Sequence, residues 1–140
     1  MNQHQISLVK ESWLSVAALD PVAVGGLFYD RLFSIAPEVR PMFRGEISEQ
    51  SKKLLSMLHY VIKKLDRLDD IIDEVKKLAV RHVHYGTCPG HYNVVGSALL
   101  WTLEQGLGAA WNDELEAAWA ACYTVLSGAM IAASAGAVAA

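Results

Sequence analysis

The most informative stretch of this sequence is residues 71–86, IIDEVKKLAVRHVHYG. Acidic residues come early in it, basic residues follow, and a glycine ends it, which suits an α-helix and its macrodipole. Ile71, Val75 and Leu78 follow one another at steps of four and three residues, so they share one helical face. The next position on that face is His82. The pattern therefore predicts an imidazole where the core is expected.

A histidine that points into a core has two common explanations. It is either a core histidine with hydrogen-bond partners, the commoner case for a single residue, or a metal ligand. Neutral imidazole is a standard axial ligand of haem iron. His84 lies roughly 200° further round the helix, so we expect it to face water. The stripe by itself leaves both explanations of His82 open.

Two more polar side chains are expected to point inward. Gln50 lies one turn before Leu54 on the apolar face of an amphipathic stretch, whereas His59 faces the opposite way. Tyr29 lies beside Phe28 in a strongly apolar segment, and a buried phenol needs a hydrogen-bond partner. Both residues also have a simpler explanation. Gln50 would then cap the start of its helix, and Tyr29 would be an ordinary core tyrosine.

Small residues accompany Tyr29 along the chain. Gly25 and Gly26 lie one turn before it and remove side chains from that helix. A second backbone can therefore approach closely. Ser51 is small enough to be the opposing residue.

The apolar periodicity predicts an all-α chain, and no segment alternates as a strand would. Six or seven helices are expected, one of them very short. Their approximate ranges are residues 5–19, 21–34, 37–43, 46–65, 69–85, 91–108 and 113 towards the C-terminus. Such a set fits either an up-and-down bundle or helices that cross at steeper angles.

Composition narrows the function. The 140 residues are predicted to form one domain, 1–140, and they are 53% hydrophobic and 19% charged. This excess of apolar residues fits either a buried apolar ligand or a dimer interface. A net charge of -3 with interspersed basic residues argues against a nucleic-acid partner. Cys88 and Cys122 form neither a disulfide framework nor a metal motif, which fits a reducing compartment.

The sequences of the two ends of the chain indicate where in the cell the protein is expected. The first residues lack the basic start and apolar run of an export signal, so a cytoplasmic location is expected. Residues 117–140 carry no charge and are long enough to span a bilayer. Their larger residues recur on one helical side, however, which favours a buried terminal helix over a membrane anchor.

Several motifs, in order along nearly the whole chain, match one family. They are Glu11-Ser12-Trp13, Leu27-Phe28-Tyr29 with Arg31-Leu32-Phe33, Ala36-Pro37 before Met42-Phe43, Arg81-His82 before Tyr85-Gly86, His91-Tyr92 with Val95-Gly96 and Leu99-Leu100, and Ala118-Trp119 before Tyr123. The chain resembles the globins, most closely the single-domain bacterial haemoglobins, the globin domains of flavohaemoglobins and the neuroglobins. The resemblance implies a three-over-three helical sandwich around haem b, which is iron protoporphyrin IX.

The resemblance also implies roles for individual residues. His82 would be the proximal ligand of the iron. The other residues expected to contact haem are Phe43, Lys53, Leu54, Tyr92 and Val95. The expected distal ligand pocket consists of Phe28, Tyr29, Gln50 and Leu54. There the Tyr29 hydroxyl and the Gln50 amide would donate hydrogen bonds to a bound diatomic ligand.

The implied function is reversible, high-affinity binding of dioxygen and nitric oxide, for oxygen storage or for nitric oxide detoxification. These 140 residues contain no flavin or nicotinamide domain, so we expect nitric oxide dioxygenation to need an external electron-donating reductase. Flavohaemoglobins orient the proximal histidine with a tyrosine and a glutamate. Tyr92 is present here, but no acidic residue follows Glu116, so a strongly anionic proximal push is not expected.

Two other functional classes stay open. One is a haem-free globin-fold sensor or interaction module, although His82, Phe43 and Tyr29 are retained. The other is a helical protein tethered to a membrane by its uncharged tail. We expect no membrane partner and a monomer or weak homodimer.

Overall fold

The computed structural model describes all residues except 44, 68–71, 85–90 and 140, together with the side chains of all these described residues except 72, 82–84 and 131–139. The described part of the chain is helical, without strands. The elements are α1 (Gln3–Ala17), α2 (Pro21–Ile35), the 3₁₀ helix η1 (Pro37–Met42), α3 (Ile47–Lys63), α4 (Ile72–His84), α5 (His91–Leu107), the short 3₁₀ helix η3 (Gly108–Ala110) and α6 (Asp113–Ala139). The predicted all-α class is confirmed.

The helix ends follow local chemistry. Asn2 and Gln5 form a reciprocal capping box at the start of α1. Asp20 caps α2 by accepting a hydrogen bond from the Val22 amide, and Pro21 follows at the first helical position. The helix ranges predicted from the sequence agree with the observed ones to within a few residues.

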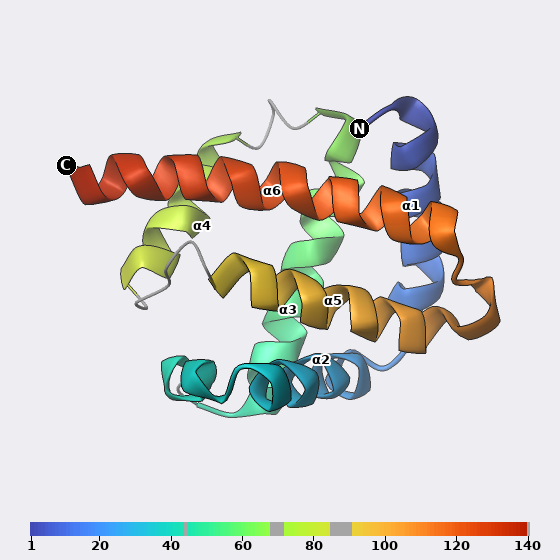
Figure 1. The fold of residues 1–140 in the computed structure, drawn as a ribbon, viewed down its shortest axis with the longest axis horizontal. Helices are drawn as coiled ribbons and strands as arrows, with labels where there is room; N and C mark the ends of the chain where they lie inside the picture. Colours follow the sequence, from blue (N-terminus) through green and yellow to red (C-terminus); the bar gives the residue numbers. More distant parts are fainter. Residues whose placement is uncertain (44, 68–71, 85–90, 140) are drawn as a thin grey trace.

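The helices pack in two crossing layers. In one layer are α1, α3 and α4, and in the other are α2, α5 and α6. Figure 1 shows α5 running beside the long α6, while α3 crosses behind both at a steep angle. The largest contacts between layers join α2 to α3 and α4 to α6. The arrangement is the predicted three-over-three sandwich, and it excludes an up-and-down bundle.

The crossing of α2 over α3 depends on two small residues. A Cβ atom at Gly25 would overlap the Cβ, Oγ and Cα atoms of Ser51. Ser51 is buried, and its hydroxyl donates to the Ile47 carbonyl at 2.7 Å, so its polar group is satisfied. The predicted close approach is thus confirmed for Gly25. It is wrong for Gly26, because nothing lies within 4 Å of a Cβ built there.

Two hydrogen bonds between side chains join α1 to α6 in the other layer and to α3. The indole N–H of Trp119 donates to the Ser12 hydroxyl at 3.0 Å, and that hydroxyl donates to the Leu8 carbonyl at 2.7 Å. The indole N–H of Trp13 donates to His59 Nδ1 at 3.1 Å. His59 therefore contacts α1, on the outward side of α3 as predicted.

Among the described residues, no single helix is long and apolar enough to cross a membrane. Only α1 and α2 taken together have such a length and composition, and the two helices are bent by 110° at their junction.

Candidate functional site: an apolar cavity between the layers

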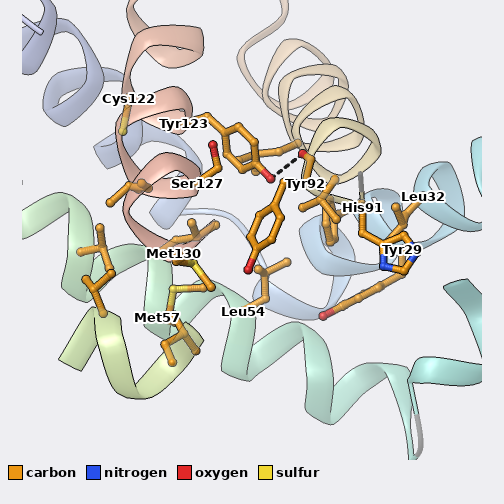
Figure 2. Close-up of a pocket in the computed structure, with 18 of the residues that line it drawn as sticks. Tyr29, Leu32, Leu54, Met57, His91, Tyr92, Cys122, Tyr123, Ser127 and Met130 are labelled. Carbon is orange, nitrogen blue, oxygen red and sulfur yellow. Dashed lines mark hydrogen bonds between the residues drawn. The ribbon is translucent and has the colours of Figure 1, made fainter. Parts of the chain in front are cut away.

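A cavity of ≈ 200 Å³ lies between the two helical layers (Figure 2). Residues of α2, η1, α3, α4, α5 and α6 line it, together with Phe43 just after η1. Most of the wall is aliphatic or aromatic, and several sulfur atoms add to it. The aromatic lining residues are Phe28, Tyr29, Phe43, Tyr92, Trp119 and Tyr123. Because protein interiors are normally close-packed, this space indicates a binding site for an apolar group.

Tyr29 is the buried phenol of the α2 wall. Its side chain is 4% exposed, and its ring lies edge-on to Phe28 and Phe43, at centroid distances of 5.0 and 5.2 Å, and stacks on Phe33 at 5.9 Å. Burial raises the pKa of Tyr29 to about 12, because the ionised form would lose its hydration. The hydroxyl therefore stays protonated and can donate a hydrogen bond at any physiological pH.

The Tyr29 hydroxyl has a weak partner in the protein itself. It donates across 3.5 Å to the main-chain carbonyl of Gln50, at the start of α3. Hydroxyl hydrogen bonds to oxygen are usually 2.5–3.0 Å long. A longer bond leaves the hydroxyl able to turn towards a better acceptor in the cavity.

The structure divides the predicted site residues into two groups. Those on the cavity wall are Phe28, Tyr29, Phe43, Leu54, Tyr92 and Val95. Gln50 and Lys53 are not on the wall: Gln50 is partly buried and meets Tyr29 through its main-chain carbonyl, and Lys53 is exposed. Leu54 is thus the residue of this part of α3 that reaches the cavity. The distal role of Gln50 and the haem contact of Lys53 stay predictions.

His82 lies in the last turns of α4, and its side chain is outside the described residues. The face on which it was predicted can nevertheless be traced. Val75 and Leu78, which precede it by seven and four residues, both line the cavity. The sequence spacing predicted His82 on the continuation of this face, and that placement stays a prediction. Its role as a metal ligand stays a prediction.

Tyr123 was named in a family motif but was not predicted as a site residue, yet it shapes the wall. Its hydroxyl donates to the Tyr92 carbonyl at 2.7 Å, and the two phenols line the cavity from α6 and α5 (Figure 2). Its ring packs on Gly96, where an added Cβ would lie 2.7 Å from Tyr123 Cε2. Burial raises the pKa of Tyr123 as well. The bond ties the first turn of α5 to α6, and only the pairing of distant helices reveals it.

His91 and Cys122 also line the cavity without having been predicted to do so. His91 is the first residue of α5 and is partly exposed. Cys122 is buried, and burial raises the pKa of its thiol to about 12. It is therefore a neutral wall residue rather than a reactive thiolate. Cys88 lies outside the described residues.

Residues 26–130 match the sequence model of the family described as Globin, and the chain belongs to the globin family. A globin-like protein of Aquifex aeolicus is 31% identical over 103 residues, which are 74% of this chain and 73% of that protein. The family and its flavohemoprotein members imply a haem cofactor.

The flavohemoproteins are longer relatives. That of Vibrio cholerae is 29% identical over 130 residues, which cover 91% of this chain and 33% of that protein. That of Bacillus subtilis is 32% identical over 111 residues, with coverages of 77% and 28%. The chain spans about a third of the length of these relatives or less.

Solved structures confirm the fold. A bacterial globin from Campylobacter jejuni superposes with a TM-score of 0.87 at 25% identity, covering 99% of this chain and 100% of that one. An engineered carbene transferase from Rhodothermus marinus superposes with a TM-score of 0.89 at 23% identity, covering 99% and 96%. The latter similarity shows the fold alone.

Proposed function

We propose that this globin holds haem b in the apolar cavity and binds dioxygen and nitric oxide there reversibly and with high affinity. The observation that supports it most is a cavity walled almost entirely by apolar side chains, with the protonated hydroxyl of Tyr29 at its wall. Haem, when bound, would supply an iron atom that an imidazole can hold and that can bind a small diatomic ligand.

The cavity residues fit such a group. A flat apolar group that fills this space of ≈ 200 Å³ removes the apolar lining from water and so stabilises the fold. Phe43, Leu54 and Val95 supply apolar surface from three different segments. In this proposal they pack against the macrocycle, while His82, further along the face of Val75 and Leu78, binds the iron.

Tyr29 would set the affinity. A diatomic ligand that gains negative charge on binding is stabilised by a hydrogen-bond donor fixed beside it. The long bond from the Tyr29 hydroxyl to the Gln50 carbonyl is easily exchanged for a bond to such a ligand. Under this proposal the Gln50 side chain would turn inward to add a second donor. Two donors acting together favour slow ligand escape.

The proposal is tested on the purified chain and its His82→Ala variant. We expect the wild type to be red, with an intense absorption band near the blue end of the visible spectrum. His82→Ala should lose the spectrum of an imidazole-bound iron. His84→Ala is the matched control, because it removes an imidazole two residues away and should change nothing.

A colourless wild-type protein would support a haem-free sensor or interaction module instead. Full loading of His82→Ala with an unaltered spectrum would refute the role of His82.

Nitric oxide detoxification is the second candidate function, and the flavohemoprotein relatives favour it. In this reaction one nitric oxide and one dioxygen combine to nitrate, and one electron from a separate reductase restores the starting state. Stopped-flow mixing of the oxygenated protein with nitric oxide should give nitrate within milliseconds. Sustained turnover only when a reductase is added supports catalysis, whereas a single turnover despite the reductase supports storage. A cytoplasmic location and a monomeric or weakly dimeric state stay predictions.

A further inference from the structure

Charged side chains are absent from the cavity wall as far as the structure describes it. Every described lining residue is apolar, aromatic, hydroxyl-bearing or sulfur-bearing, with one exception, which is His91. This imidazole is thus the basic side chain of the described wall. Haem is not wholly apolar, because one edge of it carries two carboxylates. Burying a carboxylate without a hydrogen-bond donor is costly, so these groups need a donor near solvent.

His91 has the position that such a donor requires. It is partly exposed, so it reaches both the cavity and the surrounding water. It is also the first residue of α5, where the main-chain N–H groups and the helix dipole favour an anion. The first turn of α5 contains no acidic side chain that would repel one. Figure 2 shows His91 among the lining residues, at the start of the same helix as Tyr92.

Three other polar side chains of the wall, those of Tyr123, Ser127 and Tyr29, are less suitable. The Tyr123 hydroxyl donates to the Tyr92 carbonyl at 2.7 Å. Ser127 donates to the Thr124 carbonyl of its own helix. Tyr29 is 4% exposed inside an aromatic cluster, away from the water that a carboxylate retains. Lys53, which was predicted to contact haem, is exposed and is not on the wall.

We propose that the imidazole N–H of His91 binds a carboxylate of the bound haem and so fixes the edge of the cofactor at the start of α5. The inference rests on the proposed function, since it needs haem in the cavity. A neutral imidazole keeps one N–H donor, so the bond does not require a protonated ring. His91 is a positioning residue in this proposal, and it takes no part in ligand chemistry.

The test compares iron protoporphyrin IX with its dimethyl ester, which lacks the negative charges. Each is loaded into the wild type, His91→Leu, His91→Glu and the control His4→Leu, whose imidazole is exposed, pairs with Glu114 and is not part of the cavity lining. The rate of cofactor loss to an excess of a scavenging apoglobin is measured. In the wild type the ester should be lost roughly tenfold faster than the free acid. His91→Leu should lose the free acid roughly tenfold faster than the wild type and should bring the two rates close together.

His91→Glu keeps the inference testable if the leucine variant folds poorly, because an acidic residue is well tolerated in a first helical turn. It should hasten loss of the free acid by repulsion while leaving loss of the ester unchanged. Equal ratios of the two loss rates in the wild type and in both His91 variants would overturn the role of His91, even if all proteins bind haem. Failure of the wild type to bind either pigment would instead refute the proposed function. His4→Leu should behave as the wild type throughout.

Discussion

Tyr29 carries the ligand chemistry in the proposed function, and its surroundings explain why. Three aromatic rings hold its ring in place, and burial raises the pKa of its hydroxyl to about 12. The residue is therefore a fixed and protonated donor. Its role in the core was foreseeable from the apolar segment around it, whereas its loose bond to the Gln50 carbonyl depends on where α3 begins.

Replacing Tyr29 with Phe removes the hydroxyl and keeps the ring. Dioxygen should then dissociate at least about tenfold faster, because one charge-assisted hydrogen bond is lost. Stopped-flow displacement of dioxygen by carbon monoxide measures the rate. Tyr60→Phe is the matched control, since Tyr60 is exposed on α3. An unchanged dissociation rate in the Tyr29 variant would reject the distal role.

His91 shows the opposite case, because the sequence named it within a family motif but gave it no place on the cavity wall. It begins a helix after a turn, where a histidine is unremarkable. Only the position of α5 beside α2 brings it to the cavity.

The crossing of α2 over α3 places Tyr29 and Leu54 on one wall. The two helices approach until Gly25 and Ser51 touch. Glycine is needed at position 25 because the two helices lie in close contact there, and not because the backbone makes an unusual turn. The sequence predicted a close contact, because two glycines lie one turn before Tyr29. Only the structure shows that Gly25 makes this contact and that Gly26 does not.

We expect Gly25→Ala to destabilise the protein by about 1–3 kcal/mol, because the added methyl group overlaps both the side chain and the Cα of Ser51 and forces the helices apart. Gly26→Ala, the neighbouring control, meets open space and should stabilise the protein by about 0.5–1 kcal/mol through helix propensity. Chemical denaturation followed by circular dichroism measures both. If the two variants had equal stabilities, the close contact would not determine the crossing.

The layered fold as a whole buries several ionisable groups in neutral form around one cavity. Burial raises the pKa of Tyr29 and of Cys122 to about 12 and raises that of Tyr123 too. Each raised pKa stabilises the folded state fully below the pKa of the unfolded chain. The stabilisation is then lost as the pH rises through the window up to the folded-state pKa.

The free energy of unfolding should therefore fall above pH 9 to 10. For Tyr29 alone, with an unfolded pKa near 10, the loss should reach about 1 kcal/mol by pH 11. Urea unfolding of the haem-free protein between pH 8 and 11 tests this, with Tyr29→Phe expected to have a shallower decline. A decline of the same steepness in both proteins would show that Tyr29 ionises as freely in the fold as in the unfolded chain.

Local patterns along the chain were sufficient for the helices and for one wall of the site. The approximate ranges of the helices and the stripe of Val75 and Leu78 were predicted from spacing, and both were confirmed. These features depend on neighbours within one or two turns, so the order of residues determines them directly.

The packing of the helices determined which of the other side chains reach the cavity wall. It left Gln50 and Lys53 off the wall, although their helix faces the cavity, and it brought His91 and Tyr123 onto it. Helical periodicity defines a face, but not how far along its axis one helix slides against another or at what angle the two cross. Those offsets come from contacts between residues distant in the chain, such as Gly25 with Ser51 and Gly96 with Tyr123.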